Sequence, residues 1–184
     1  MRVEWSSFWD YVNLGVEHIW TGYDHLLFLL AVMIGTGKPA HYIQILTAFT
    51  IGHSLTLALA SLDLVSLPSS IIEPLIALSI VVVSLESLFR PALAGRWRLT
   101  LPFGLIHGFG FAGVLQGFTS SNFALALFSF NLGVEIGQLA VLLIILPVLH
   151  YLLRQTTRKE WFKHALALVT GIFGLVWLVE RTIF

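Results

Sequence analysis

Apolar residues fall into six runs along the chain, and short polar stretches separate these runs. The first run covers about residues 23–34, and it is too short to cross a bilayer without residues borrowed from the preceding segment. Each of the other runs reaches the length of about 20 residues that a transmembrane helix needs. They cover about residues 41–62, 68–89, 99–118, 122–151 and 163–183. The pattern predicts an all-α fold, a polytopic membrane helix bundle of about six transmembrane helices.

The segment before the first run is amphipathic. Its polar residues Asp10, Asn13 and Glu17 fall on other helix faces than its apolar residues, which recur at helical spacing. The apolar set is Trp5, Phe8, Trp9, Val12, Val16, Ile19 and Trp20. We expect residues 1–22 to lie at the lipid headgroup boundary and to lead into the first span, within one transmembrane domain over residues 1–184. Because acidic residues interrupt the apolar run that a secretory signal has, we expect this segment to stay in the mature protein.

Composition supports a membrane protein. Hydrophobic residues make up 57% of the chain and charged residues 11%, whereas a soluble domain carries about 25% charged residues. Membrane lipid is therefore the expected partner of most of the surface, and the net charge of zero argues against nucleic acid. Since the chain has no cysteine, a metal site in it would use nitrogen and oxygen ligands.

The distribution of basic residues predicts the orientation. The first, third and fifth connections between the runs are basic, and the second and fourth carry no Lys or Arg. Two basic residues, Arg2 and Arg181, fall on the other side. The eight in these connections are Lys38, Arg90, Arg96, Arg98, Arg154, Arg158, Lys159 and Lys163. Basic connections stay in the cytoplasm, so we expect both termini to be extracytoplasmic. The expected location is the bacterial inner (cytoplasmic) membrane, which the chain would cross several times.

Several ionisable residues lie inside or beside the apolar runs. Such a group near the membrane centre costs about 2.5–3.5 kcal/mol, so it is usually paired, protonated or functional. Glu86 falls nearer the cytoplasmic side, and the predicted metal ligands are the others: His18, Asp24, His25, His53, Glu73, His107 and Glu135. Because these residues come from several predicted helices, we infer a shared internal site. Imidazole and carboxylate suit divalent nickel, cobalt or zinc, so the predicted ligand is one of these ions.

The spacing of His18 and His25 leaves two arrangements open. Seven residues apart in an unbroken helix, they would share a face but lie about 10 Å apart along the axis. One ion could not bind both, since metal–nitrogen bonds are about 2 Å long. Either the helix breaks near Thr21-Gly22, or the two histidines serve successive positions on a path.

Five short stretches around these residues carry a family resemblance. They are His18-Ile-Trp-Thr-Gly-Tyr-Asp24-His25, Phe49-Thr-Ile-Gly-His53-Ser-Leu-Thr, Glu73-Pro74, Phe103-Gly-Leu-Ile-His107-Gly-Phe-Gly and Phe130-Asn131-Leu-Gly-Val-Glu135-Ile-Gly-Gln138. In this order they resemble the HupE/UreJ family of hydrogenase and urease accessory membrane proteins, over nearly the whole chain. Members are regarded as nickel or cobalt permeases. The resemblance implies that His18, Asp24 and His25 handle the metal, together with His107.

Three functions are compatible with the polar set. The first is transport or handling of a divalent transition metal, nickel or cobalt above all, with weak successive sites that allow the ion to leave. The second is a zinc-dependent intramembrane hydrolase acting on a lipid or membrane peptide, with Glu73 or Glu135 as general base and Ser54 in support. The third is haem bound between His53 and His107, in which the clustered acids would have no role.

Overall fold

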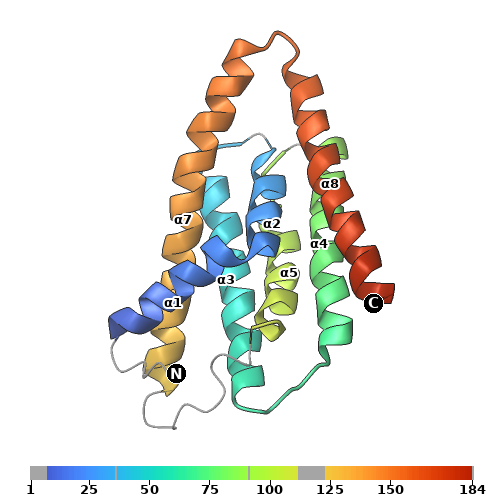
Figure 1. Ribbon diagram of the computed structural model, residues 1–184. Helices are drawn as coiled ribbons and strands as arrows, with labels where there is room; N and C mark the ends of the chain where they lie inside the picture. Colours follow the sequence, from blue (N-terminus) through green and yellow to red (C-terminus); the bar gives the residue numbers. More distant parts are fainter. Residues whose placement is uncertain (1–7, 36, 91, 112–122, 184) are drawn as a thin grey trace.

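The computed structural model describes residues 8–35, 37–90, 92–111 and 123–183, and helices account for the regular structure of these ranges (Figure 1). The helices are α1 (Phe8–Thr21), α2 (Tyr23–Met33), α3 (Pro39–Ser61), α4 (Ser69–Phe89), α5 (Trp97–Phe109), α7 (Phe123–Gln155) and α8 (Lys159–Ile183). The predicted all-α class is confirmed.

Four helices, α3, α4, α7 and α8, are long and apolar enough to cross a membrane. The chain is therefore an integral membrane protein. Helix α2 has 11 residues and α5 has 13, so each is shorter than the roughly 20 residues of a full span. In Figure 1, α2, α4 and α7 end at the upper end of the bundle, and α3, α5 and α8 begin there. The basic connections thus gather at this one end.

Two predicted helix extents are wrong. The fourth run was expected to stay helical to residue 118, but α5 ends at Phe109 and a turn follows at Gly110. The Gly110 N–H donates to the His107 carbonyl, which closes the last turn in the tighter three-residue manner common at helix ends. Residues 112–118 of the expected span lie outside the described ranges. The first span was expected to borrow residues from the preceding segment. Instead, that segment forms a separate helix, α1, which ends before Gly22 and runs in a different direction from α2 (Figure 1).

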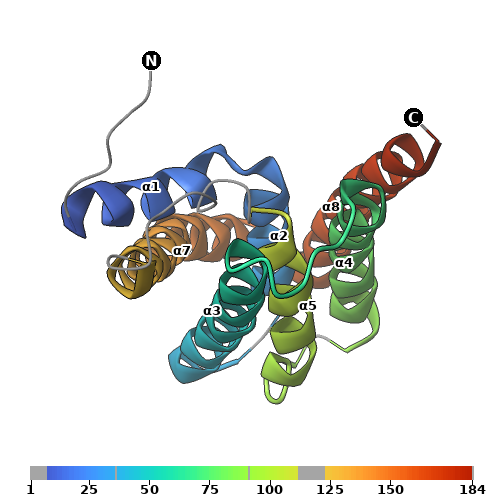
Figure 2. The same cartoon turned by 90° about the horizontal axis from the view of Figure 1, so that it is seen from below.

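Helix α1 packs along α7, as Figure 2 shows from below. Its contact face includes Val12 and Gly15, both buried, whereas Trp9 is exposed. A Cβ atom at Gly15 would collide with the carbonyl oxygen of Phe130, and one at Gly133 would collide with that of Val12. Glycines therefore allow the two backbones to touch, as small residues do between membrane helices. The expected amphipathic segment is helical from Phe8, and its residues 1–7 lie outside the description.

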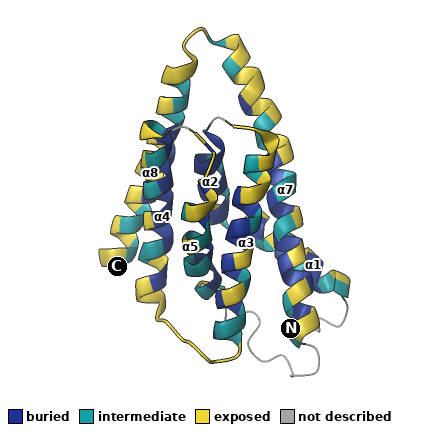
Figure 3. Cartoon of the chain, turned by 180° about the vertical axis from the view of Figure 1, so that it is seen from behind, coloured by how far each residue is buried: buried dark blue, intermediate teal, exposed yellow. Residues whose placement is uncertain are grey.

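Helices α3 and α5 pack in the same close way. A Cβ atom at Gly104 would collide with the carbonyl oxygen of Phe49, and one at Gly108 with that of His53. The glycines of α5 thus allow the close packing that brings His107 to its neighbours. Away from these contacts the helices present large apolar side chains outward, and Figure 3 shows how much of the α7–α8 end is exposed. Lipid is the natural cover for such a surface.

Candidate metal site

Three histidines from three helices meet inside the bundle. His18 lies on α1, His25 on α2 and His53 on α3, and one ring nitrogen of each lies within 4.8 Å of the others. The ring centroid of His18 lies 4.5 Å from that of His25 and 5.7 Å from that of His53. Two nitrogens bound to one ion at about 2 Å each lie at most about 4 Å apart. Small ring rotations would therefore let all three bind a single ion.

The break between α1 and α2 brings the first two histidines together. Helix α1 ends at Thr21, and Gly22 adopts an extended conformation with φ −79° and ψ 91°. A Cβ atom at Gly22 would lie 2.7 Å from the His18 carbonyl oxygen and 2.8 Å from Nδ1 of His25. Glycine is therefore the residue that fits this position. Of the two arrangements that the spacing left open, the structure has the broken helix.

The histidine nitrogens are available for a ligand. His53 is fully buried and His25 nearly so, while His18 is half-buried but has a buried Nε2 atom. Nε2 of His18 and of His25 and both ring nitrogens of His53 form no hydrogen bond to any residue in the described ranges. A buried polar group without a partner costs about 1–3 kcal/mol. A bound cation would remove that cost, so these residues fit a metal ion.

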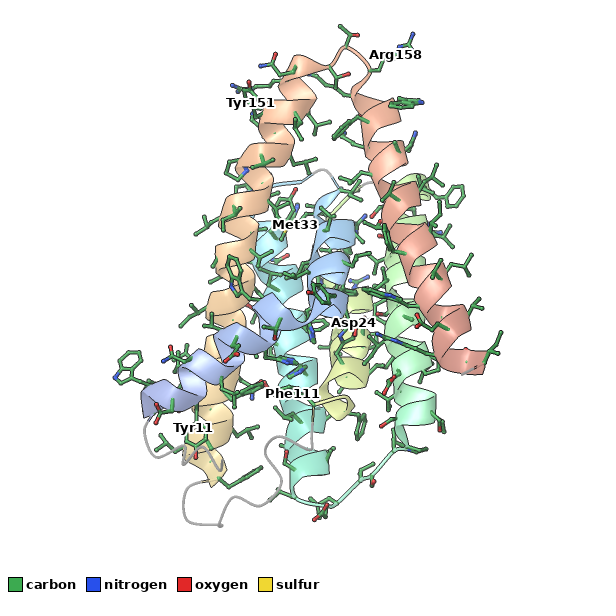
Figure 4. All side chains as sticks on the ribbon, viewed as in Figure 1. Tyr11, Asp24, Met33, Phe111, Tyr151 and Arg158 are labelled. Atoms are coloured by element: carbon green, nitrogen blue, oxygen red, sulfur yellow. The ribbon has the colours of Figure 1, made fainter. Side chains whose placement is uncertain are left out.

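Aromatic side chains surround the histidine group. Phe111, labelled in Figure 4, lies against His18 with ring centroids 3.8 Å apart and the ring planes tilted by 41°. Phe130 from α7 lies 5.6 Å from the same ring, and Phe49 lies 6.1 Å from His53. These rings contribute no strong metal ligand, and they keep the group in apolar surroundings. Hence the unpartnered nitrogens of the three histidines lie among apolar rings.

His107 on α5 lies next to the group, with its ring 4.9 Å from that of His25. Its Nε2 atom is 3.1 Å from Oγ of Ser79, and that hydroxyl donates its hydrogen to the Ile76 carbonyl at 2.6 Å. Since a serine hydroxyl has one hydrogen, His107 must donate from Nε2. Nδ1 of His107 then carries the lone pair, and this buried atom has no partner within the described ranges. His107 is therefore a fourth histidine with a nitrogen that can bind metal.

The predicted carboxylates have other partners. Asp24, labelled in Figure 4, forms an ion pair with Arg181, with Asp24 oxygens 3.0 and 3.2 Å from Nη2. Glu135 accepts a hydrogen bond of 2.6 Å from Oγ1 of Thr47. Glu73 is exposed near the start of α4. The structure thus brings His18, His25 and His53 together, with His107 adjacent, and in the described ranges none of the three predicted acids belongs to the group.

Three contributors were not singled out from the sequence as site residues. Ser79 orients His107, and Arg181 holds Asp24. Asn131, which sequence analysis noted only through the family stretch, lies beside His53 with its Oδ1 atom buried. Nothing in the spacing of Ser79 or Arg181 connects them to the histidines. Arg181 and Asn131 had a signal, because each is a polar residue in or close to an apolar run.

Multi-span helical membrane proteins with a buried histidine group are the class that this fold and site define. Within that class, the family model described as HupE / UreJ protein matches residues 1–181, and the chain belongs to this family. The resemblance found in the five stretches is confirmed. Membership implies an accessory or transport role in nickel or cobalt handling. Comparisons with curated proteins and with solved structures gave no match.

Proposed function

We propose that this protein transports a divalent transition metal ion, nickel or cobalt above all, through an intramembrane site formed by His18, His25 and His53. His107 is the fourth nitrogen ligand. The observation that supports this most is the group of imidazoles from three helices whose buried nitrogens lack partners among the described residues. Imidazole binds both ions well, and a site without thiolate releases them more readily.

Charge balance gives the carboxylates a role. Imidazole ligands are neutral, so an ion of charge +2 in this apolar interior needs anions close by. Glu135 on α7 and Asp24 on α2 are candidates, with the exposed Glu73 on the approach. Successive weak sites allow an ion both to enter and to leave. In the proposed path the ion is captured near Asp24 and Glu73, binds the histidine group, and moves on past His107.

The opposite side of the histidine group is closed. Along α2, Phe28 and Val32 follow His25, and both belong to a buried apolar cluster with Phe49. Beyond them, Arg96 donates to the Val32 carbonyl at 2.9 Å and pairs with Glu86 at 2.7 Å. This conformation fits the stage of a transport cycle in which the ion has arrived and the onward path is shut.

We place the basic end of the bundle in the cytoplasm, as the excess of Lys and Arg there supports. Both termini would then be extracytoplasmic, in a bacterial inner membrane. The short helices α2 and α5 would complete a six-helix arrangement with the four long ones. Since neither could cross a bilayer of about 30 Å alone, the histidine group would lie at a locally thin or water-accessible part of the protein.

Two of the residues assigned to a hydrolase, Ser54 and Glu135, have other partners. Ser54 donates to the Thr50 carbonyl at 2.6 Å, and Glu135 accepts from Thr47. Haem between His53 and His107 would have to displace Phe49, whose ring contacts both. Transport therefore remains the function that the geometry supports best.

Elemental analysis of the purified protein tests the proposal. After exposure to Ni²⁺ in detergent, the wild type should retain the ion and His53→Ala should lose most of it. His164→Ala is the matched control, because His164 is exposed near the start of α8. Liposomes loaded with a nickel-sensitive dye would then report flux. Equal nickel in all three proteins would refute the site, and bound nickel without flux would refute transport.

A further inference from the structure

The C-terminal end of α8 is held to two other helices by a single side chain. Arg181 contacts both carboxylate oxygens of Asp24 through Nη2, at 3.0 and 3.2 Å. Its Nη1 atom donates to the backbone carbonyl of Glu73 at 3.3 Å. The guanidinium also lies over the ring of Trp177, 5.3 Å from its centroid. Arg181 thereby joins the starts of α2 and α4 to the end of α8.

These contacts lie in an open recess of about 740 Å³. Its lining includes the carboxylates of Asp24, Glu73 and Glu180, and Arg181 is its one cation in the described part of the chain. The negative charge therefore exceeds the positive, which attracts cations. Gly22 also lines the recess, and this residue touches His18 and His25. The recess thus adjoins the histidine group.

Asp24 has an unusual position in this arrangement. It directly precedes His25, yet it does not belong to the group of His18, His25 and His53, whose ligand atoms lie within 4.8 Å of one another. Both of its oxygens face the guanidinium of Arg181 instead. A divalent ion that enters the recess meets a carboxylate already bound to a cation. The ion and Arg181 cannot both remain close to Asp24 without repulsion between them.

We propose that Arg181 is a tethered counter-ion that competes with the incoming metal ion for Asp24, so that arrival of the ion releases the end of α8. This inference rests on the proposed function. Arg181 is a positioning residue in this scheme, since it acts on the ion through Asp24. The exchange also favours divalent ions, because a monovalent ion would replace one unit of charge with another and gain little.

The exposure of the pair makes exchange feasible. The side chains of Arg181 and Asp24 are 22% and 25% exposed. Ion pairs with access to water contribute little net stability, whereas fully buried pairs are costly to break. A metal ion could therefore displace Arg181 at a small cost. The displaced guanidinium would still have Glu180 in the recess and Trp177 beneath it.

Helix α8 is built to respond to such a release. Only 17% of the residues in its most apolar stretch are buried inside the protein, compared with 56% for the corresponding stretch of α3. Its middle is anchored to α4 by the buried contact between Thr170 and Ser84, whose hydroxyl oxygens lie 2.9 Å apart. Arg181 lies 11 residues beyond Thr170, about 16 Å along the helix axis. Loss of the Arg181 contacts would free the last turn of α8, beyond Trp177, which packs against the buried apolar cluster that contains Phe28 and Phe49.

Calorimetric titration of the full-length protein in detergent with Co²⁺ tests the competition. Arg181→Gln should bind Co²⁺ about fivefold more tightly than the wild type, the scale of a lost ion pair of this exposure. Arg181→Lys should stay near the wild type, because it keeps the competing charge. Asp24→Asn should bind more weakly, and Arg181→Gln should then have no further effect in that background. Arg158→Gln, at the other end of α8, is the control and should leave the affinity unchanged.

A second measurement reads the release itself. Because the chain has no cysteine, Val179→Cys introduces one labelling site on the exposed face of α8. A spin label there should become more mobile when diamagnetic Zn²⁺ is added, and should already be mobile in Arg181→Gln. If the wild type binds no metal, the proposed function fails and this inference with it. If it binds metal but Arg181→Gln shows unchanged or weaker affinity, or the label does not respond, the inference alone is wrong.

Discussion

The imidazole rings of His18 and His25 lie 4.5 Å apart although seven residues separate them along the chain. In a continuous helix they would lie about 10 Å apart along the axis. Gly22 makes the difference, because α1 ends just before it and α2 begins just after it. The close approach of the two ligands His18 and His25 thus depends on Gly22, a residue without a side chain.

Replacing that residue should damage both the metal site and the fold. In Gly22→Ala the new Cβ atom would press on the His18 carbonyl oxygen and on Nδ1 of His25. We expect Co²⁺ affinity to fall by at least about tenfold, the loss that misplacing one ligand produces. The melting temperature should fall as well, because the His18 carbonyl belongs to the backbone and cannot move aside as a flexible side chain can. Calorimetry and thermal unfolding in detergent measure the two effects.

Gly171→Ala is the matched control for this substitution. Its Cβ atom would meet only Ser84, at 3.3 Å, on a helix that contributes no histidine to the group. Wild-type affinity in both variants would show that the close approach at Gly22 does not matter.

The hydroxyl of Ser79 should control how His107 binds metal. In Ser79→Ala the Nε2–H group of His107 loses its acceptor, so the ring can rotate and change tautomer. Loss of such a supporting hydrogen bond lowers metal affinity by about 10–100-fold in known sites. Ser79→Thr keeps the hydroxyl and should restore part of the affinity. The visible spectrum of bound Co²⁺, which reports ligand geometry, should differ from the wild type only in the alanine variant.

Arg96 should stabilise the fold at the end of the bundle where the basic connections gather. It is buried, and it donates to the Val32 carbonyl at 2.9 Å and the Arg90 carbonyl at 3.0 Å besides pairing with Glu86. Arg96→Met leaves Glu86 and both carbonyls without this donor, and a buried polar group without a partner costs about 1–3 kcal/mol. We expect a clear fall in melting temperature. Arg96→Lys should recover little of it, because one ammonium cannot reach three acceptors arranged for a guanidinium.

Metal binding should weaken as the pH falls. Protons and the metal compete for the same imidazole lone pairs, and the metal-bound form requires neutral histidine. Affinity should therefore be greatest at neutral to mildly alkaline pH and decrease through the range in which the free histidines become protonated. Titrations in buffers of different ionisation enthalpy would show proton release only at a pH at which the metal-free histidines carry protons. Affinity that stays unchanged through the pH range in which the metal-free histidines take up protons, followed by NMR, would contradict ligation by imidazole.

Much of the bundle was predictable from single residues and their periodicity. The apolar runs predicted the four long helices, because a span requires a fixed length of apolar residues whatever their order. The histidines were conspicuous for the same reason, since polar side chains are costly in such runs. The five stretches from His18 to Gln138 were enough to recognise the family.

The short helices were harder to predict. Hydropathy continues through Gly110, where α5 has already ended, and apolar character alone does not show where a backbone stops being helical. The partners of the polar side chains were also hidden. Asp24 and Arg181 are 157 residues apart in the chain, and Ser79 and His107 are 28 apart. Neither separation matches any local period.

The amino-acid order by itself determined that the chain enters a membrane as helices and carries imidazoles where water is scarce, because both follow from the cost of transferring each residue out of water. Which of those imidazoles meet, and which carboxylate is held by an arginine instead, depended on tertiary structure. The physical reason is that glycines such as Gly22 and Gly104 let backbones turn or touch. Where they do so, the packing of several helices at once decides which side chains come within reach.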